Sequence, residues 1–171
     1  MAYVFHNTNL GHPAIAATLP AATSAGRSTP GPWLGDIATA QDQTYGNGEF
    51  IYLLGVASTV VGSWVTYNLD DNSTKLLVAD DIGPVAVAMS ANVAGQYGWY
   101  QIHGKAIGLA LTGFIDNALV YSTSTPGSVD DAVVAGERVF NAKGASAVGT
   151  PSAGLAEFEI ARPWIQNTAA D

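Results

Sequence analysis

The chain lacks several of the residues and segments on which common kinds of site depend. It contains no cysteine among its 171 residues, which excludes disulfide frameworks, thiolate zinc sites and cysteine nucleophiles. Charged residues make up only 12% of it, about half the usual share. The net charge is -8, and the six basic residues are scattered singly along the sequence. A protein that binds phosphate backbones normally carries a basic stripe, so we expect no nucleic-acid partner.

Long apolar segments are also absent. No run of about 18 apolar residues exists, so the sequence predicts no transmembrane helix and no membrane partner. The first residues lack the basic and apolar regions of a secretory signal, and we expect a soluble protein. No long window carries a sustained helical stripe of apolar residues. These absences direct attention to β-structure.

Short apolar and β-branched runs follow one another from residue 49 onward, separated by turns rich in Gly, Asn, Asp and Pro. Runs at a spacing of roughly 8–12 residues are typical of β-sandwiches and β-barrels. The sequence therefore predicts an all-β fold, a compact β-barrel or β-sandwich with a jelly roll possible. Gly104 is expected to break one strand, and Arg162 with Pro163 to end the last one. The predicted strands are residues 49–54, 60–67, 75–79, 85–89, 97–103, 105–111, 118–122, 137–142 and 155–161.

Residues 1–48 have a different composition, with low charge and an excess of proline. Proline fixes its own φ and biases the preceding residue toward extended structure. We expect an extended N-terminal arm over residues 1–48 that docks on a neighbouring subunit, and a β-rich domain over residues 49–171. Trp33 would anchor the arm in a pocket of the partner. The prolines of this stretch are Pro13, Pro20, Pro30 and Pro32.

The side chains that carry chemistry show no recognisable motif. The histidines at positions 6, 12 and 103 lack the spacing of zinc ligands, and the residues around Ser146 do not match a nucleophile elbow. We expect no catalytic residue, no cofactor and no metal ion. A triad assembled from distant residues, with His103 as the base, stays open. The adjacent aspartates at 70–71, 80–81 and 130–131 are interpreted as solvated turns rather than calcium ligands.

Aromatic residues concentrate in the predicted strand over residues 97–103. Alternation places Tyr97 and Trp99 on one face of this strand, and Tyr100 with Ile102 on the other. One face can fill the core while the second meets a partner subunit, or both faces can be internal. A stacking platform for bases or sugars is the third possibility. The candidate protein-interface residues are Trp33, Tyr97, Trp99 and Tyr100.

Four segments resemble a family of small structural proteins that are encoded beside the major capsid protein in tailed bacteriophages. The resemblance covers residues from about 40 to 165 and includes a G-W-Y-Q-I-x-G-K-A strand and an S-T-x-G-x-V-D-D turn. These motifs are structural and contain no catalytic signature. The segments are GNGEFIYLLGVASTVVGSWVTY (residues 46–67), IGPVAVAMSANVAGQYGWYQIHGKA (82–106), YSTSTPGSVDD (121–131) and LAEFEIARP (155–163).

The resemblance implies a capsid decoration, or cement, protein that is made in the host cytoplasm and binds the outside of the virion. The β-rich domain over residues 49–171 would then be the capsid-binding domain. Its partners would be the major capsid protein and further copies of itself, as a homotrimer. Composition independently favours a homo-oligomer, because 48% apolar residues with few charges leave apolar surface for an interface. A protein of this kind needs no enzyme chemistry and gains avidity when several copies engage the shell at once.

Three other functions stay open at this stage. Another virion structural role, such as a head fibre base, a knob or a tail component, is the nearest alternative. A small hydrolase is the most distant one. A carbohydrate-binding module belongs to a different class, and its aromatic platform would come from Trp33, Trp64, Trp99 and Trp164.

Overall fold

The computed structural model describes residues 1–7, 12–20 and 32–167, and these residues form one large antiparallel sheet of twelve strands. The all-β prediction is confirmed: none of the described residues is helical, so none lies in a helix that could cross a membrane. The sheet is not closed into a barrel. The strands are β1 (Val4–Phe5), β2 (Thr18–Pro20), β3 (Ile37–Asp42), β4 (Gly46–Leu54), β5 (Trp64–Tyr67), β6 (Thr74–Leu76), β7 (Gly83–Ala88), β8 (Gln96–Leu109), β9 (Leu119–Ser122), β10 (Val129–Asp130), β11 (Arg138–Gly144) and β12 (Leu155–Ile165).

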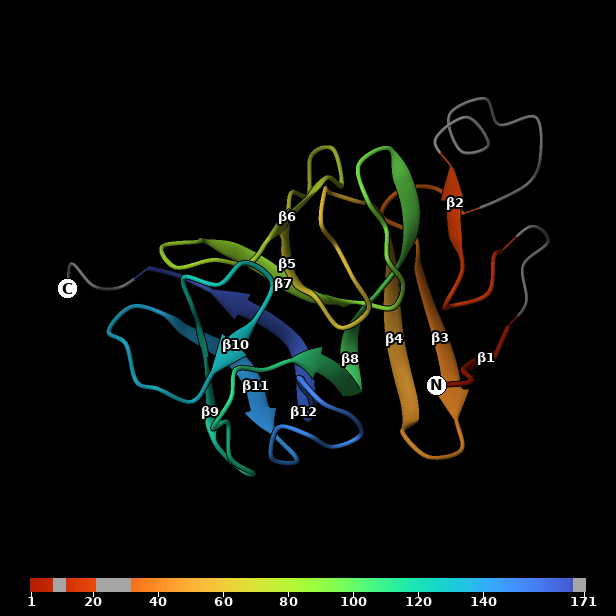
Figure 1. The fold of residues 1–171 in the computed structure, drawn as a ribbon. Helices are drawn as coiled ribbons and strands as arrows, with labels where there is room; N and C mark the ends of the chain where they lie inside the picture. Colours follow the sequence, from red (N-terminus) through yellow and green to blue (C-terminus); the bar gives the residue numbers. More distant parts are fainter. Residues whose placement is uncertain (8–11, 21–31, 168–171) are drawn as a thin grey trace.

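Strand β8 organises the sheet. It has 14 residues and pairs with β4, β2, β7 and β12 along its length. The strand order is β1-β3-β4-β8-β7-β12-β11-β9-β10, and the β5–β6 hairpin attaches to β7. Figure 1 shows the first four strands on one side of β8 and the strands β9 to β12 on the other. Segments that are distant in the sequence therefore meet at β8.

The sheet curls back on itself on both sides of β8. The pair Leu54 and Ser73 forms an isolated bridge between the end of β4 and the start of the β6 region, and Ala110 with Val129 forms a second one beyond β8. Each bridge joins only one pair of residues, so each curl stays open. The strong right-handed twist of antiparallel sheets accounts for this curling.

Three hydrophobic clusters fill the curls and cover the sheet. The largest includes Trp64 and Phe158, whose rings pack edge to face with centroids 4.9 Å apart. The second contains Tyr100 and Ile102, and the third contains Trp99 with residues that come before β4. Alternation along β8 thus sends neighbouring aromatic residues into different clusters, and both faces of the strand are buried there. Each fully buried large apolar side chain contributes about 1.5–3 kcal/mol.

Two expected strand ends are wrong, for a common physical reason. Strand β8 runs through Gly104, which has a φ of 100°, and β12 runs through Arg162, which has a φ of 51°, and Pro163. Pairing is irregular near both places: β4 and β8 shift register beside Glu49, and β11 and β12 shift beside Phe140. A β-bulge accommodates a residue with positive φ or a missing N–H without ending the strand.

The expected boundary at residue 48 falls inside β4 rather than between two structural units. Strand β3 pairs with β4, β1 pairs with β3, and β2 pairs with β8. Ile15 is 3% exposed and belongs to the same cluster as Trp99. The described part of residues 1–48 is therefore integrated into the sheet and the core of its own chain, while Pro30 lies outside the described residues. Docking of this part on a neighbouring subunit stays a prediction.

Candidate functional site

The four candidate interface residues lie in very different surroundings. Trp33 is 63% exposed, whereas Trp99 and Tyr100 have no exposed surface. Tyr97 is half-buried and stacks on Tyr52 with an interplanar angle of 18°. The assignment of Trp99 and Tyr100 to an interface is corrected: a partner cannot reach side chains that the core encloses. Trp33 and Tyr97 keep surface that a partner can contact.

Specific contacts explain why Trp99 belongs to the core. Its indole N–H donates to the backbone oxygen of Pro13 at 3.1 Å, which ties the N-terminal segment to β8. Its ring packs edge to face against Tyr52 and Phe5, with centroids 5.1 and 5.6 Å away. Amphipathic aromatic residues are most stable when the ring is buried and the N–H is bonded. The covering residues come from far along the chain, so the strand pattern alone does not reveal them.

Tyr100 lies on the opposite face of β8, in the second hydrophobic cluster. Burial raises the pKa of its hydroxyl to about 12, although the neighbouring side chains of Thr74, Asn92 and Thr59 act in the other direction. The hydroxyl is therefore protonated at every physiological pH. Its role is structural, because the side chain is fully buried in the second hydrophobic cluster.

Exposed apolar side chains gather at loops and strand ends rather than along the strand 97–103. Three of them, Ile115, Val133 and Val134, lie in two loops. The two loops are joined by a hydrogen bond, in which the carboxylate of Asp131 accepts from the N–H of Ile115 at 3.1 Å. Exposed apolar residues that lie next to one another mark surfaces that a partner can cover. Others on the described surface are Met1, Val4, Trp33, Ile37, Val60, Val61, Leu69, Ile82, Val93, Leu119 and Trp164.

One group of these residues lines an open groove of about 570 Å³ at the ends of β5, β6, β7 and β12. Trp164 is 41% exposed there, and Leu69 and Ile82 are 66% and 68% exposed. The sequence alone does not distinguish Trp164 from Trp64, which is fully buried. The lining includes Tyr67, Leu69, Thr74, Ile82, Pro84 and Trp164.

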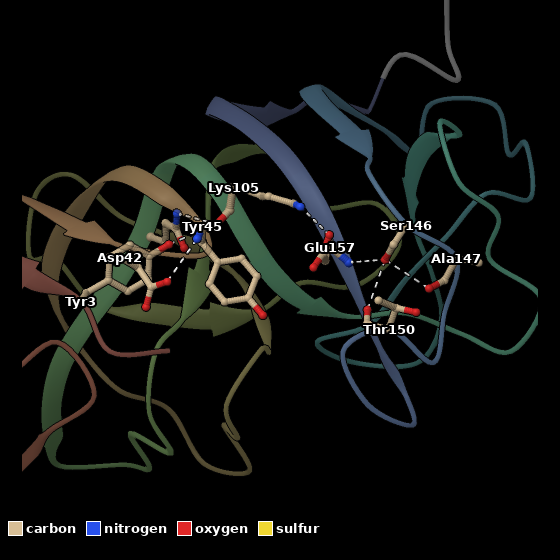
Figure 2. A network of polar contacts seen from close by, with 9 residues as sticks. Tyr3, Asp42, Tyr45, Lys105, Ser146, Ala147, Thr150 and Glu157 are labelled. Carbon is tan, nitrogen blue, oxygen red and sulfur yellow. Dashed lines mark hydrogen bonds and ion pairs between the residues drawn. The ribbon is translucent and has the colours of Figure 1, made fainter.

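A polar network links the N-terminal strands to β12 through Lys105 (Figure 2). The Lys105 Nζ forms an ion pair with Glu157 at 2.5 Å and lies 5.9 Å from the centre of the Tyr45 ring. The hydroxyl of Tyr3 donates to the backbone oxygen of Lys105 at 3.2 Å. Since Lys105 and Glu157 come from β8 and β12, this network connects three parts of the sheet.

Ser146 extends the same network to the loop between β11 and β12 (Figure 2). Its Oγ accepts a hydrogen bond from the N–H of Glu157 at 2.9 Å and lies 3.1 Å from the Thr150 oxygen, to which it donates. These contacts satisfy backbone groups and hold the loop against β12. The side chain thus acts as a local turn-stabilising group, as serine hydroxyls often do.

The histidines and aspartates that could serve as ligands are dispersed. His12 packs against Phe5 and Trp99, and His103 lies exposed on β8. Within residues 1–7, 12–20 and 32–167, no group of three or more His, Cys, Asp or Glu side chains is placed to hold a metal ion. Asp81 differs from the expected solvated turn, since it is buried and paired with Lys75.

Asp42 is the side chain that ties the first residues to the sheet. Its carboxylate accepts hydrogen bonds from the N–H groups of Ala2, Thr44 and Tyr45 at 2.6, 2.8 and 3.1 Å. Burial acts to raise the pKa of this carboxyl, but the three hydrogen bonds outweigh it and lower the pKa below its ordinary value. The ionised form of Asp42 therefore stabilises the folded protein.

We expect Asp42→Asn to lower the free energy of unfolding by about 1–2 kcal/mol at pH 7, because a charged acceptor forms stronger hydrogen bonds than an amide. The folded-state pKa is lowered, so this contribution is complete above the unfolded value of about 4 and is lost as the pH falls through the folded pKa. Urea unfolding at pH 7 and pH 3 measures the free energy of unfolding of both proteins. The difference between wild type and variant should be smaller at pH 3 than at pH 7.

The matched control is Glu159→Gln, which removes an exposed carboxylate that pairs with Lys143 at 3.1 Å. It should change stability by less than about 1 kcal/mol at either pH. If the free energies of unfolding of wild type and Asp42→Asn differed by the same amount at both pH values, the charge of Asp42 would be unimportant for stability.

Comparisons with known proteins identify no relative of this chain: no family model, curated protein or solved structure matches it. The resemblance to capsid decoration proteins rests on the quoted segments and stays a prediction. The exposed apolar residues and the groove are therefore the features of this chain that bear on its function.

Proposed function

We propose that this protein is a structural component of a phage particle that binds the outside of the capsid and stabilises the shell. The observation that carries the proposal is the set of large apolar side chains exposed at loops and strand ends, on a chain with only 12% charged residues. Surfaces of this kind are typical of proteins that are covered by a partner. The partners would be the major capsid protein and further copies of the same chain.

A rigid scaffold supports this proposal. Described residues from the N-terminal segment and from all parts of the sheet are joined by three hydrophobic clusters and by the Lys105 network. A reinforcing protein must transmit load without unfolding, and a densely packed interior resists deformation. Few residues then need to become ordered on binding, which lowers the entropic cost of association.

Trp33 is the residue that we propose as the main capsid anchor. Its backbone is held by Asp36, which accepts the Trp33 N–H through its carboxylate at 2.5 Å and donates its own N–H to the Trp33 oxygen at 2.9 Å. The indole is therefore presented from a fixed turn, with exposed Ile37 nearby in the sequence. Tryptophans of this kind are enriched among residues that dominate binding energy.

We expect Trp33→Ala to weaken binding to purified expanded capsids by about tenfold or more, measured by co-sedimentation over a range of protein concentrations. Trp164→Ala serves as the control, because it removes the same side chain from a different part of the surface and should bind normally. Failure of the wild-type protein to sediment with capsids would refute the proposed function. If wild type and Trp33→Ala bound capsids equally well, the role of Trp33 as the anchor would be refuted, but the proposed function would not.

The expected assembly on the shell is a homotrimer. Multiple copies gain affinity from simultaneous engagement of neighbouring capsid subunits. Light scattering of the free protein measures its state in solution, and a particle reconstruction measures the state on the capsid. Isolated copies without mutual contact on the particle would contradict the trimer, and binding to tails or fibres in place of heads would favour another virion role.

A further inference from the structure

Three residues on neighbouring strands form a row across the groove described above. Trp164 of β12 pairs with Pro84 of β7, and the next residue of β7, Val85, pairs with Thr66 of β5. Continuing this antiparallel register by one residue places Tyr67 opposite Pro84. Directly opposed residues project to the same face of a sheet. We call Trp164, Pro84 and Tyr67 the aromatic row.

The aromatic row is open to a ligand. All three of its residues line the groove of about 570 Å³, and Trp164 is 41% exposed while Tyr67 and Pro84 are half-buried. Neighbouring strands lie about 4.8 Å apart, so the two aromatic residues, two strands apart, are about 10 Å from each other. The row thus offers two aromatic surfaces with an apolar proline ring between them.

The polar groups of the groove are mostly uncharged. Asn68, Ser73 and Thr74 supply amide and hydroxyl groups, and Asp70 supplies a carboxylate. Lys75 also lines the groove, and its positive charge is offset by an ion pair with the buried carboxylate of Asp81. Burial raises the pKa of Tyr67, which keeps its hydroxyl protonated and able to donate. The lining suits a ligand with apolar faces and many neutral hydroxyls.

We propose that the aromatic row binds a neutral oligosaccharide. The apolar C–H faces of two sugar rings would pack on Trp164 and Tyr67, with an intervening ring over Pro84. Rings of an extended glycan repeat at a spacing close to that of neighbouring strands, so alternate rings reach the two aromatic residues. Hydroxyl groups at the edges of the rings would bond to Asn68 and Asp70. Aromatic surfaces with a few placed polar groups are the usual composition of small-ligand sites.

This binding would be separate from attachment to the capsid. The proposed capsid anchor, Trp33, is absent from the lining of the groove, and the aromatic row belongs to β5, β7 and β12. A decoration protein with such a site would display a glycan-binding surface on the particle exterior. The inference about the glycan does not depend on the capsid proposal, since the free protein should bind as well.

The test uses the full-length protein and an array of neutral oligosaccharides, including hexamers of glucose, mannose and N-acetylglucosamine. Binding that the array detects is then measured by calorimetry with the soluble hexasaccharide. We expect wild type to bind at least one of these glycans and Trp164→Ala to bind it about tenfold or more weakly. Tyr67→Phe keeps the ring and should lose less affinity than Trp164→Ala.

Trp33→Ala is the matched control, and it should bind the same glycan as tightly as wild type does. The proposal is overturned if no neutral glycan on the array binds, or if Trp164→Ala binds as well as wild type. A change in oligomeric state caused by Trp164→Ala, without glycan binding by wild type, would instead identify the groove as a contact between copies of the chain.

Discussion

Trp99→Ala should destabilise the protein by about 3–5 kcal/mol, as truncation of a buried tryptophan usually does. The substitution removes a ring with no exposed surface, its contacts with Phe5 and Tyr52, and the hydrogen bond to the Pro13 oxygen. A domain of this size has a total stability of about 5–15 kcal/mol, so the variant should have a much lower denaturation midpoint. Equilibrium unfolding in urea, followed by circular dichroism, measures the change.

Trp33→Ala provides the comparison, because it makes the same substitution at a side chain that is 63% exposed. It should change the free energy of unfolding by less than about 1 kcal/mol. Similar losses in the two variants would mean that Trp99 does not hold the N-terminal segment on β8. The pair of variants also separates a core tryptophan from the proposed capsid anchor.

The sequence was sufficient to predict the fold class, because alternation in short runs is a local property. Tyr100 and Ile102 share one face of β8 and Trp99 lies on the other, as alternation requires. Most of the residues that cover each face lie far from β8 in the sequence. The face of Trp99 is covered by Phe5 and by the segment around Ile15, which follow no regular pattern and precede β8 by many residues. Composition therefore predicted an arm over residues 1–48, whereas the described part of this segment contributes to the core.

The aromatic row illustrates the same limit for the candidate site. Trp164, Pro84 and Tyr67 belong to three strands, and only the pairing of β12 with β7 and of β7 with β5 brings them into one line. Pairing between distant strands is set by tertiary packing and register, which a single sequence does not display. Trp164 could be proposed as a binding residue from its residue type, but the sequence does not show that Pro84 and Tyr67 lie beside it.

Gly104→Ala should destabilise the protein by about 2–5 kcal/mol, for two reasons that add. Gly104 has a φ of 100°, which L-residues with a side chain rarely adopt, at a cost of about 1–2 kcal/mol. A Cβ at this position would also lie 2.3 Å from the backbone oxygen of Asn47, which cannot move without disturbing β4. Overpacking of this kind costs about 1–3 kcal/mol. Urea unfolding compared with wild type measures the sum.

Gly113→Ala separates the two contributions. Gly113 has a similar φ of 106°, but no atom lies within 4 Å of the position where its Cβ would be. This variant should therefore show only the backbone cost, about 1–2 kcal/mol. The difference between the two variants measures how closely β4 approaches β8 at the bulge. Equal losses of stability in the two variants would mean that the backbone of Asn47 can shift to make room for the Cβ. The bulge at Gly104 would then be less tightly packed than the 2.3 Å contact implies.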